Sequence, residues 1–320
     1  MALELSCAFA TSPASHEHAR IAEALGYRRA FFYDSPVLYL DVWVQLCRAA
    51  ERTERIGLGP GVLIPSLRHP MTNAAAIAIL AGLAGAARVV VGVGSGFTGR
   101  MAMGQRAMRW RDVAVYVHTL RGEQVLWEGK PIQMLHTPGF VPPRPLEVPF
   151  IIAAGGPKGI AVAREVGDGV AGAMPIGGFA WSLVFTFGTV LADGEEADAE
   201  RPLAAAGHGA AMLLHYSAEY GRLDTLLPEQ GRQWLSAYDA VPVESRHLAM
   251  HYGHLVLVNE CDRPYVTGAL LRQLGLARSA AGWLERLAQL EAAGATEIAY
   301  QPAGPDIARE LEAFITAVRG

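Results

Sequence analysis

Cysteine and charge are both scarce in this sequence. Its 320 residues include only Cys7, Cys47 and Cys261, an odd number with no CxxC spacing. This pattern argues against a disulfide framework or a zinc module and favours reduced thiols in the cytoplasm. Only 18% of the residues are charged, the formal net charge is −4, and no run of five or more lysines and arginines occurs. We therefore expect no nucleic acid partner.

Signals for export and membrane insertion are also missing. No lysine or arginine precedes Arg20, so the N-terminus lacks the basic region that opens a signal peptide, and we expect a cytoplasmic protein. Residues 169–192 carry no charge and are long enough to span a bilayer, but a proline and several glycines interrupt them. We expect a buried strand followed by a core-facing helix there, and no membrane segment.

Hydrophobic residues and glycines are plentiful, at 51% of the chain and 35 residues respectively. They indicate a large core with many tight turns. Short apolar runs alternate with helical patterns, which is typical of repeated βα units. The length suits a single (β/α)8 TIM barrel over residues 1–320. We predict strands at residues 3–10, 30–33, 56–62, 88–93, 150–154, 169–174, 210–216 and 297–301.

The helical patterns and two irregular regions complete this prediction. Residues 129–149 hold six of the nineteen prolines and should form a loop or hairpin inserted after the fourth helix. Residues 217–294 are mainly helical and exceed what a barrel needs, so we expect them to cap the active-site end. Helices are predicted to include residues 21–25, 41–52, 70–83, 106–121 and 306–318.

The segment from Gly59 to Pro70 is the first candidate binding element. Glycines at the carboxyl end of a strand let backbone come close to a ligand, and barrel active sites are built at that end. Arg68 and His69 stand just before the predicted helix, so their donors could meet an anionic or carbonyl group. Equally, the glycines could simply end the strand and Arg68 could form a structural salt bridge.

Two further glycine segments end predicted strands. The run Gly92-Val93-Gly94-Ser95-Gly96 is not a dinucleotide fingerprint, because its third glycine comes one position too early. It could still offer bare backbone to a ring or phosphate, or form a tight turn. The run Ala154-Gly155-Gly156-Pro157-Lys158 places exposed N–H groups and a lysine at a helix start, which suits phosphate, although a bare strand-to-helix turn is the alternative. Gly172 and Met174 should end the neighbouring strand.

Acidic and imidazole groups supply the candidate catalytic residues, which are Asp34, His69, His215 and His251. Asp34 ends the second strand at the same mouth, where it could bind a ring or substrate or cap a turn. One histidine could act as a general acid or base over a ring. His247 and His251 have i,i+4 spacing but lack the Glu of HExxH and an obvious third ligand, so no metal site is expected.

Several of these segments share a joint pattern. They are Ile56-Gly57-Leu58-Gly59-Pro60-Gly61-Val62, Arg68-His69-Pro70, Val91-Gly92-Val93-Gly94-Ser95-Gly96, Gly155-Gly156-Pro157-Lys158-Gly159 and Gly167-Asp168-Gly169-Val170. In this order they resemble the bacterial luciferase-like superfamily of flavin- and F420-dependent enzymes. The stretch Gly96-Phe97-Thr98-Gly99-Arg100-Met101-Ala102-Met103-Gly104 is most similar to relatives of methylenetetrahydromethanopterin reductase, which favours F420.

The resemblance implies a TIM barrel with a flavin-type ring at the strand ends, and often a homodimer. It also implies a cis peptide bond at Gly61–Val62 behind the ring, a phosphate-binding turn at Gly155 and Gly156, and an acidic position at Asp34. Ala154 departs from the pattern, since a more polar residue is expected there. The residues expected to bind the cofactor are Gly61, Val62, Arg68, Gly94, Ser95, Gly96, Ala154, Gly155, Gly156, Pro157, Lys158, Gly172 and Met174.

The function favoured by this pattern is an F420-dependent oxidoreductase that transfers a hydride to or from a small organic substrate. An FMN-dependent luciferase-like monooxygenase is the alternative. A cofactor-free binding member of the fold is a second alternative, which the glycine turns at three neighbouring strand ends make less attractive. Hydrolysis gains no support, because the sequence has no GxSxG elbow.

Overall fold

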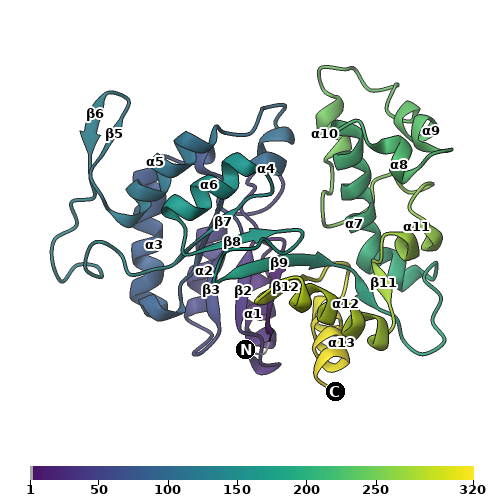
Figure 1. Ribbon diagram of the computed structural model, residues 1–320, viewed down its shortest axis with the longest axis horizontal. Helices are drawn as coiled ribbons and strands as arrows, with labels where there is room; N and C mark the ends of the chain where they lie inside the picture. Colours follow the sequence, from purple (N-terminus) through teal and green to yellow (C-terminus); the bar gives the residue numbers. More distant parts are fainter. Residues whose placement is uncertain (1–2) are drawn as a thin grey trace. The chain divides into compact units, whose positions relative to one another are not determined.

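The computed structural model describes residues 3–320 and contains one eight-stranded sheet (Figure 1). The strand order is β3-β2-β1-β12-β9-β8-β7-β4, and isolated bridges between Leu58 and Val89 and between Leu63 and Val93 bring the two edges together. The result is a nearly closed parallel barrel, which confirms the predicted (β/α)8 fold. Its strands are β1 (Glu4–Phe9), β2 (Arg29–Phe32), β3 (Gly57–Pro60), β4 (Val91–Gly94), β7 (Phe150–Ala153), β8 (Gly169–Gly172), β9 (Ser182–Phe187) and β12 (Glu297–Gln301).

The chain divides into two compact units. The first comprises the residues up to Arg100 together with Arg106–Thr186 and Gln289–Tyr300. The second comprises Met101–Gln105, Phe187–Ala288 and Gln301–Gly320. The barrel strands, apart from the last residues of β9 and β12, belong to the first unit.

Local sequence signals set the helices of the first unit. The Asp41 carboxylate accepts from the N–H groups of Trp43 and Val44 and so caps one helix, and Pro70 occupies the first turn of another, which ends at Gly85 with φ of 81°. These helices and their neighbours are α1 (Ser15–Ala24), α2 (Val42–Ala50), α3 (Pro70–Ala84), α4 (Phe97–Met101), α5 (Trp110–Arg121) and α6 (Pro157–Val166). Two 3-10 turns, η1 (Pro65–Leu67) and η2 (Ala86–Arg88), flank α3.

A hairpin begins just before the segment predicted as an insertion, residues 129–149, and overlaps its start. The strands β5 (Val125–Trp127) and β6 (Lys130–Ile132) pair antiparallel directly after α5. The hairpin projects from the helices of the first unit in Figure 1. The residues that follow it run mostly without regular structure to β7, in keeping with their many prolines.

The predicted seventh strand was wrong. Residues 210–216 lie inside the long helix α7 (Glu200–Glu219), and the barrel strand at this point is β9. A short apolar run cannot by itself be distinguished from a turn of buried helix, and this one is rich in Ala, Leu and Met, which favour helix. The uncharged residues 169–192 correspondingly contain β8, β9 and β10 (Thr189–Val190) instead of a strand and a helix.

No helix in the described part of the chain is long and apolar enough to cross a membrane. The three cysteines are free thiols.

The second unit is mainly helical, as the pattern of residues 217–294 predicted. Its core is built around the buried side chains of Leu214, Trp234, Tyr238 and Leu271. The elements are α7, α8 (Leu223–Leu226), α9 (Gly231–Ser236), α10 (Arg246–Met250), α11 (Gly268–Gln273), α12 (Ala280–Ala292) and α13 (Ile307–Arg319), with β10 and β11 (Ala277–Arg278) paired in parallel.

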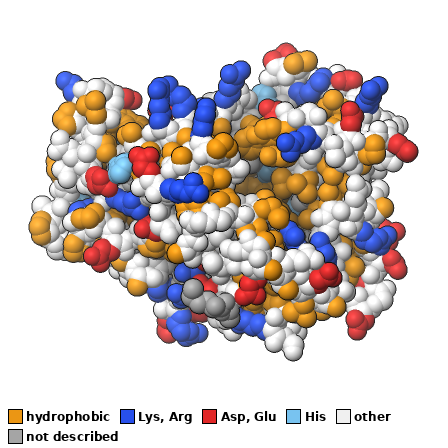
Figure 2. All heavy atoms as spheres, in the orientation of Figure 1, with side chains coloured by type: hydrophobic (Ala, Val, Ile, Leu, Met, Phe, Trp, Pro, Cys, Tyr) orange, Lys and Arg blue, Asp and Glu red, His pale blue; other side chains and the backbone are white. Residues whose placement is uncertain are grey.

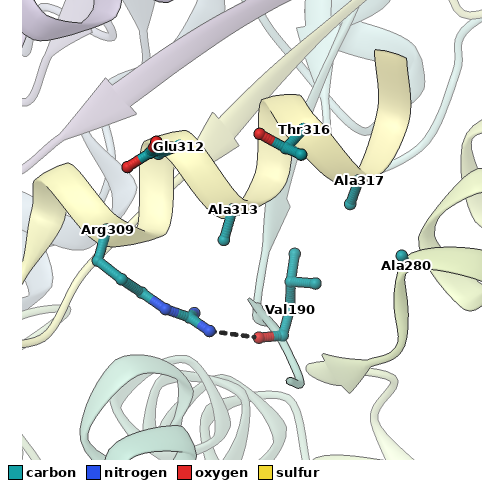
Figure 3. Close-up of a pocket in the computed structure, with 7 residues that line it drawn as sticks. All are labelled: Val190, Ala280, Arg309, Glu312, Ala313, Thr316 and Ala317. Atoms are coloured by element: carbon teal, nitrogen blue, oxygen red, sulfur yellow. Dashed lines mark hydrogen bonds between the residues drawn. The ribbon is translucent and has the colours of Figure 1, made fainter. Parts of the chain in front are cut away.

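A shallow hollow lies beside α13 in this unit (Figure 3). Alanine side chains from α13 and Ala280 line much of it, and the Arg309 guanidinium donates to the Val190 carbonyl at 3.2 Å. Arg309 also pairs with Glu310 at 2.8 Å. Its charged group is therefore satisfied by the protein, and this hollow has no arrangement of groups that suggests chemistry.

Candidate active site at the barrel mouth

The predicted cofactor residues occupy one arc of the barrel. Four neighbouring strands, in the order β8-β7-β4-β3, contribute them from their carboxyl ends. β3 is followed by Gly61 and Val62, β4 ends at Gly94, β7 leads into the turn at Gly155, and β8 ends at Gly172. Because barrel enzymes build their sites at this end, the structure brings these residues to a suitable place.

The segment after β3 forms a bulge between β2 and β4. The Gly61–Val62 peptide bond is cis, as the family resemblance predicted. The Gly61 N–H donates to the Phe32 carbonyl on the β2 side, at 2.8 Å. The Leu63 N–H donates to the Gly92 carbonyl on the β4 side, also at 2.8 Å. The bulge is thus held from both neighbours, and the side chain of Val62 is half-buried.

Gly94, the last residue of β4, and Gly96 beyond it are both closely packed on the side where a side chain would lie. A Cβ on Gly94 would lie 2.9 Å from Cγ2 of Val62, and one on Gly96 would lie 2.5 Å from Cγ2 of Ile64. Gly96 also has φ of 79°, which favours glycine. In the direction of a side chain, the space beside these glycines is filled by the bulge.

The turn after β7 is open by contrast. A Cβ on Gly155 or Gly156 would meet no atom within 4 Å, and both residues are exposed. Gly156 is the N-cap of α6, no side chain caps this helix, and Lys158 is exposed in its first turn. Free N–H groups at a helix start favour an anion, so the turn fits the phosphate of a cofactor. Figure 2 shows basic side chains grouped over the part of the first unit that holds α5 and α6.

Ala154 has a structural explanation. Its N–H donates to the Ala171 carbonyl at 3.0 Å, and its side chain is buried beside Gly159. A Cβ on Gly159 would lie 2.6 Å from the ring of Trp110, so α5 and α6 approach closely here. The apolar residue at position 154 is therefore explained by helix packing. Gly172 is half-buried and Met174 is 54% exposed at the end of the next strand.

Asp34 and Arg68 form a buried ion pair. Arg68 Nη1 donates to Asp34 Oδ1 at 2.7 Å, and Arg68 Nη2 reaches Asp41 Oδ2 at 3.0 Å. Asp34 Oδ2 accepts from the Ile64 N–H at 3.2 Å. Burial raises the pKa of Asp34 more than the Arg68 charge lowers it, while the two carboxylates raise the pKa of Arg68 against its own desolvation. The Arg68 guanidinium thus pairs with two carboxylates, as in the alternative that gave Arg68 a structural salt bridge.

His69 caps a helix. Its Nδ1 accepts from the Met71 N–H at 3.2 Å at the start of α3, and its ring meets Trp127 edge-on with the centroids 5.7 Å apart. One ring nitrogen is therefore engaged in holding the helix start.

The two other candidate histidines lie in the second unit. His215 Nε2 is 2.9 Å from Oδ2 of Asp262, and His215 and His251 are both buried. The sequence spacing suggested His247 and His251 on one helix face, but α10 ends at Met250. The structure instead groups His251 with His254 and His215. The role of His215 or His251 as a proton donor stays a prediction.

Comparison with known proteins supports the assignment of the barrel. Residues 12–183 match the sequence model of a family described as luciferase-like monooxygenase, and this match spans more than half of the chain. The chain belongs to the luciferase-like monooxygenase family. The matched residues include the cis bulge at Gly61 and Val62, the segment from Gly92 to Gly96, and the open turn at Gly155 and Gly156.

Individual relatives match a smaller part of this chain than the family model does. An F420-dependent glucose-6-phosphate dehydrogenase of Beutenbergia cavernae is 37% identical over 132 residues, which are 38% of this chain and 38% of the dehydrogenase. A 5,10-methylenetetrahydromethanopterin reductase of Archaeoglobus fulgidus is 30% identical over 139 residues, which are 41% of this chain and 40% of the reductase. The chain thus matches about two fifths of the length of each relative.

A solved structure extends the likeness in fold to the whole chain. The coenzyme F420-dependent tetrahydromethanopterin reductase of Methanopyrus kandleri aligns with a TM-score of 0.66 over 99% of both chains, at 20% identity.

Sequence reasoning missed a buried polar group on α2, α3 and α5 that reaches the backbone of Arg68 in this luciferase-like chain. Trp43 Nε1 donates to Asn73 Oδ1 at 2.8 Å, the Asn73 amide donates to the Tyr116 hydroxyl, and that hydroxyl lies 3.5 Å from the Arg68 carbonyl. Burial raises the pKa of Tyr116, which keeps its hydroxyl protonated. The available signal was Asn73 itself, a polar residue in the otherwise almost wholly apolar α3.

Proposed function

We propose that this luciferase-like protein is an F420-dependent oxidoreductase that transfers a hydride to or from a small organic substrate. The observation that carries the proposal is the open turn at Gly155 and Gly156, which lies on the same arc of strand ends as the cis Gly61–Val62 bulge. Two sequence relatives, both named as F420-dependent glucose-6-phosphate dehydrogenases, support this cofactor over FMN.

The chain would bind and orient the cofactor, and bound F420 would supply the hydride carrier. The N–H groups at the start of α6 and the ammonium group of Lys158 would hold the phosphate. Val62, Ser95 and Met174, which are all at least partly exposed at neighbouring strand ends, would contact the ring or the substrate. Asp34 would act as a positioning residue, because it holds the Ile64 N–H just beyond the bulge.

Cofactor titration tests this proposal. Purified protein is titrated separately with F420 and with FMN, and binding is followed by cofactor absorbance and fluorescence. We expect saturable binding of F420. Replacing Gly155 by Val should weaken it about tenfold, because a side chain would occupy the open turn, while the unfolding temperature stays unchanged. Saturable binding of FMN with none for F420 would contradict the proposal.

An FMN-dependent monooxygenase is the second candidate, since the family description names monooxygenases. It predicts oxygen consumption when reduced FMN and substrate are supplied to the protein. A cofactor-free binding protein, the remaining alternative, predicts no spectral change with either cofactor.

We also propose that the protein is a cytoplasmic homodimer that associates through α2 and α3. The fifteen residues of α3 carry no charge, and Ile79 and Leu83 on this helix are 53% and 45% exposed. Val44 on α2 is 57% exposed. Such an apolar surface is typical of an interface between subunits. Light scattering should give the mass of a dimer, and Ile79→Glu should shift it to that of a monomer; a monomeric native protein would contradict this.

A further inference from the structure

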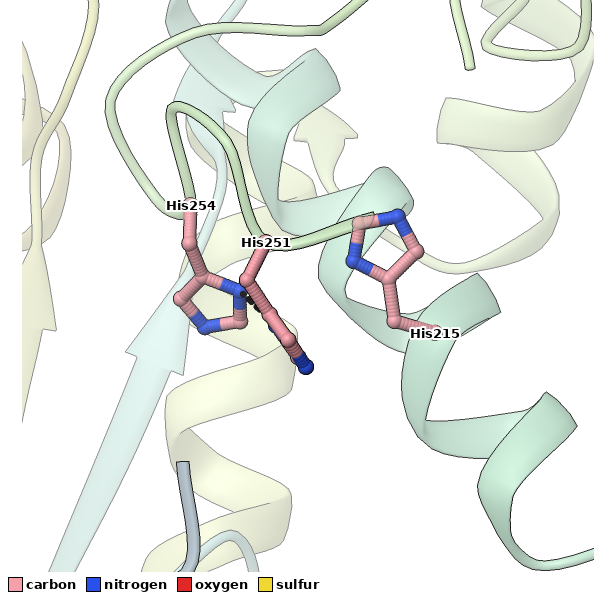
Figure 4. Close-up of side chains that lie close together, drawn as sticks. All are labelled: His215, His251 and His254. Atoms are coloured by element: carbon pink, nitrogen blue, oxygen red, sulfur yellow. Dashed lines mark hydrogen bonds between the residues drawn. The ribbon is translucent and has the colours of Figure 1, made fainter. Parts of the chain in front are cut away.

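Three buried histidines meet in the second unit. His215 lies on α7, and His251 and His254 lie in the turns that follow α10. They are 5%, 6% and 7% exposed, and one ring nitrogen from each lies within 4.8 Å of the other two. Figure 4 shows the His215 ring turning a nitrogen toward the side on which His251 and His254 lie.

A carboxylate fixes the orientation of His215. Asp262 Oδ2 lies 2.9 Å from His215 Nε2, and Asp262 Oδ1 accepts from Trp234 Nε1 at 2.9 Å and from the Tyr238 hydroxyl at 2.7 Å. Carboxylate oxygens accept hydrogen bonds, so this contact suits the His215 tautomer in which Nε2 is the donor. Histidines that bind a metal through one ring nitrogen usually donate the other N–H to such a carboxylate.

The other nitrogen of His215 is left over. Nδ1 is buried and has no hydrogen-bond partner among residues 3–320. In the neutral tautomer with Nε2 as donor, Nδ1 presents a lone pair. A buried acceptor without a partner is costly, which calls for an explanation of what it binds.

The remaining two histidines have the spacing of metal ligands. Nδ1 of His251 and Nδ1 of His254 lie 3.4 Å apart. Nitrogens bound tetrahedrally to Zn²⁺ at 2.0–2.1 Å are separated by roughly 3.3–3.4 Å.

We propose that His215, His251 and His254 form a binding site for a divalent transition metal ion, Zn²⁺ in the first place. Imidazole nitrogen suits this class of metal, and three protein ligands leave the fourth tetrahedral position for water or another ligand. The ion would join α7 to the irregular segment around residues 251–262. The proposal is independent of the cofactor assigned to the barrel.

The 320-residue chain, freed of metal with a chelator and returned to Zn²⁺, tests the proposal. We expect one Zn²⁺ per chain by elemental analysis, and X-ray absorption should show three imidazole ligands at about 2.0–2.1 Å. This measurement uses the native chain, so it does not depend on how a variant folds. Failure to retain stoichiometric Zn²⁺, or a ligand shell without imidazole, would overturn the proposal.

Variants locate the ion. The double substitution His251→Gln and His254→Gln should abolish stoichiometric binding. His247→Gln is the matched control, because it removes a half-buried histidine from the same segment outside the cluster, and it should bind like the native protein. Asp262→Asn should weaken Zn²⁺ affinity 10- to 100-fold, because His215 would lose the carboxylate that orients its ring. Unchanged binding by the double variant would place the ion elsewhere and refute the site.

Discussion

Buried titratable groups differ between the two units of this protein. In the barrel unit two buried carboxylates lie against arginines: Asp34 meets Arg68 at 2.7 Å, and Glu297 meets Arg29 at 2.6 Å. In the second unit several are histidines held neutral, since burial lowers the pKa of both His208 and His251 to about 4. The ion pairs offset buried charge in the barrel unit, whereas a neutral imidazole buries no charge.

The glycines of the barrel unit also fall into two kinds, those that are closely packed and those that face open space. Gly59 lies where β3 meets β4, and a Cβ there would be 1.6 Å from the Val90 carbonyl oxygen. Gly155 faces open space. One glycine permits the barrel to close, and the other leaves room for a ligand. Glycine therefore serves close packing at one strand of the barrel and leaves open space at another.

The largest expected effect tests the glycine contrast. Gly59→Ala should prevent the barrel from closing and lower the free energy of unfolding by more than about 4 kcal/mol, because backbone atoms cannot yield to the new methyl group. Gly155→Ala should change it by less than about 0.5 kcal/mol. Thermal unfolding followed by circular dichroism measures both. Equal effects would remove the distinction.

The paired charges of the barrel are tested next. Arg68→Met should destabilise the protein by about 3–5 kcal/mol, since it leaves the buried Asp34 carboxylate without its counter-ion. Without Arg68 the pKa of Asp34 should rise further, so the loss should grow as the pH rises above the ordinary value of about 3.9.

Two variants serve as controls for Arg68→Met. Asp41→Asn alters the more exposed partner and keeps a residue that can cap α2, so its cost should stay within about 1 kcal/mol. Adding Asp34→Asn to Arg68→Met should recover part of the loss. Chemical denaturation measures each. Additive losses in the double variant would show that the pair does not act as a unit.

Acid should affect the second unit through His208. Its folded pKa of about 4 lies below the ordinary 6.5, so the unfolded chain binds more protons and stability is lost as the pH falls from about 6.5 to about 4. The loss should be on the order of 3 kcal/mol. In His208→Gln the free energy of unfolding should fall less steeply between about pH 6.5 and pH 4, measured on the chelator-treated protein. An unchanged pH dependence of the free energy of unfolding would mean that His208 does not cause the loss of stability in acid.

The smallest expected effect concerns the open turn. The chain has only two lysines, Lys158 at the start of α6 and Lys130 on the hairpin. Lys158→Ala should weaken F420 binding about three- to fivefold, as an exposed ion pair is worth up to about 1 kcal/mol. Lys130→Ala should have no effect. Equal F420 titration curves for the two variants would show that Lys158 does not contact the cofactor phosphate.

Much of the barrel could be predicted because its signals are local. The β12 strand was placed at residues 297–301 from its apolar run, and α13 from its amphipathic pattern. The strand at β9 was missed, since residues 182–187 stand in a longer uncharged stretch that also suits a buried helix. The cis bond at Gly61–Val62 was predicted from the resemblance to a family, and no local property of the two residues indicates it.

The sequence by itself determined where the chain turns, which stretches alternate between strand and helix, and that glycine-rich segments end neighbouring strands. Only the tertiary structure decided what each segment meets: Arg68 finds Asp34 across 34 positions, and His215 finds Asp262 across 47. It also decided that Gly94 is covered by Val62 while Gly155 is open. Local patterns follow from backbone geometry and burial over a few residues, whereas these contacts depend on how distant segments pack together.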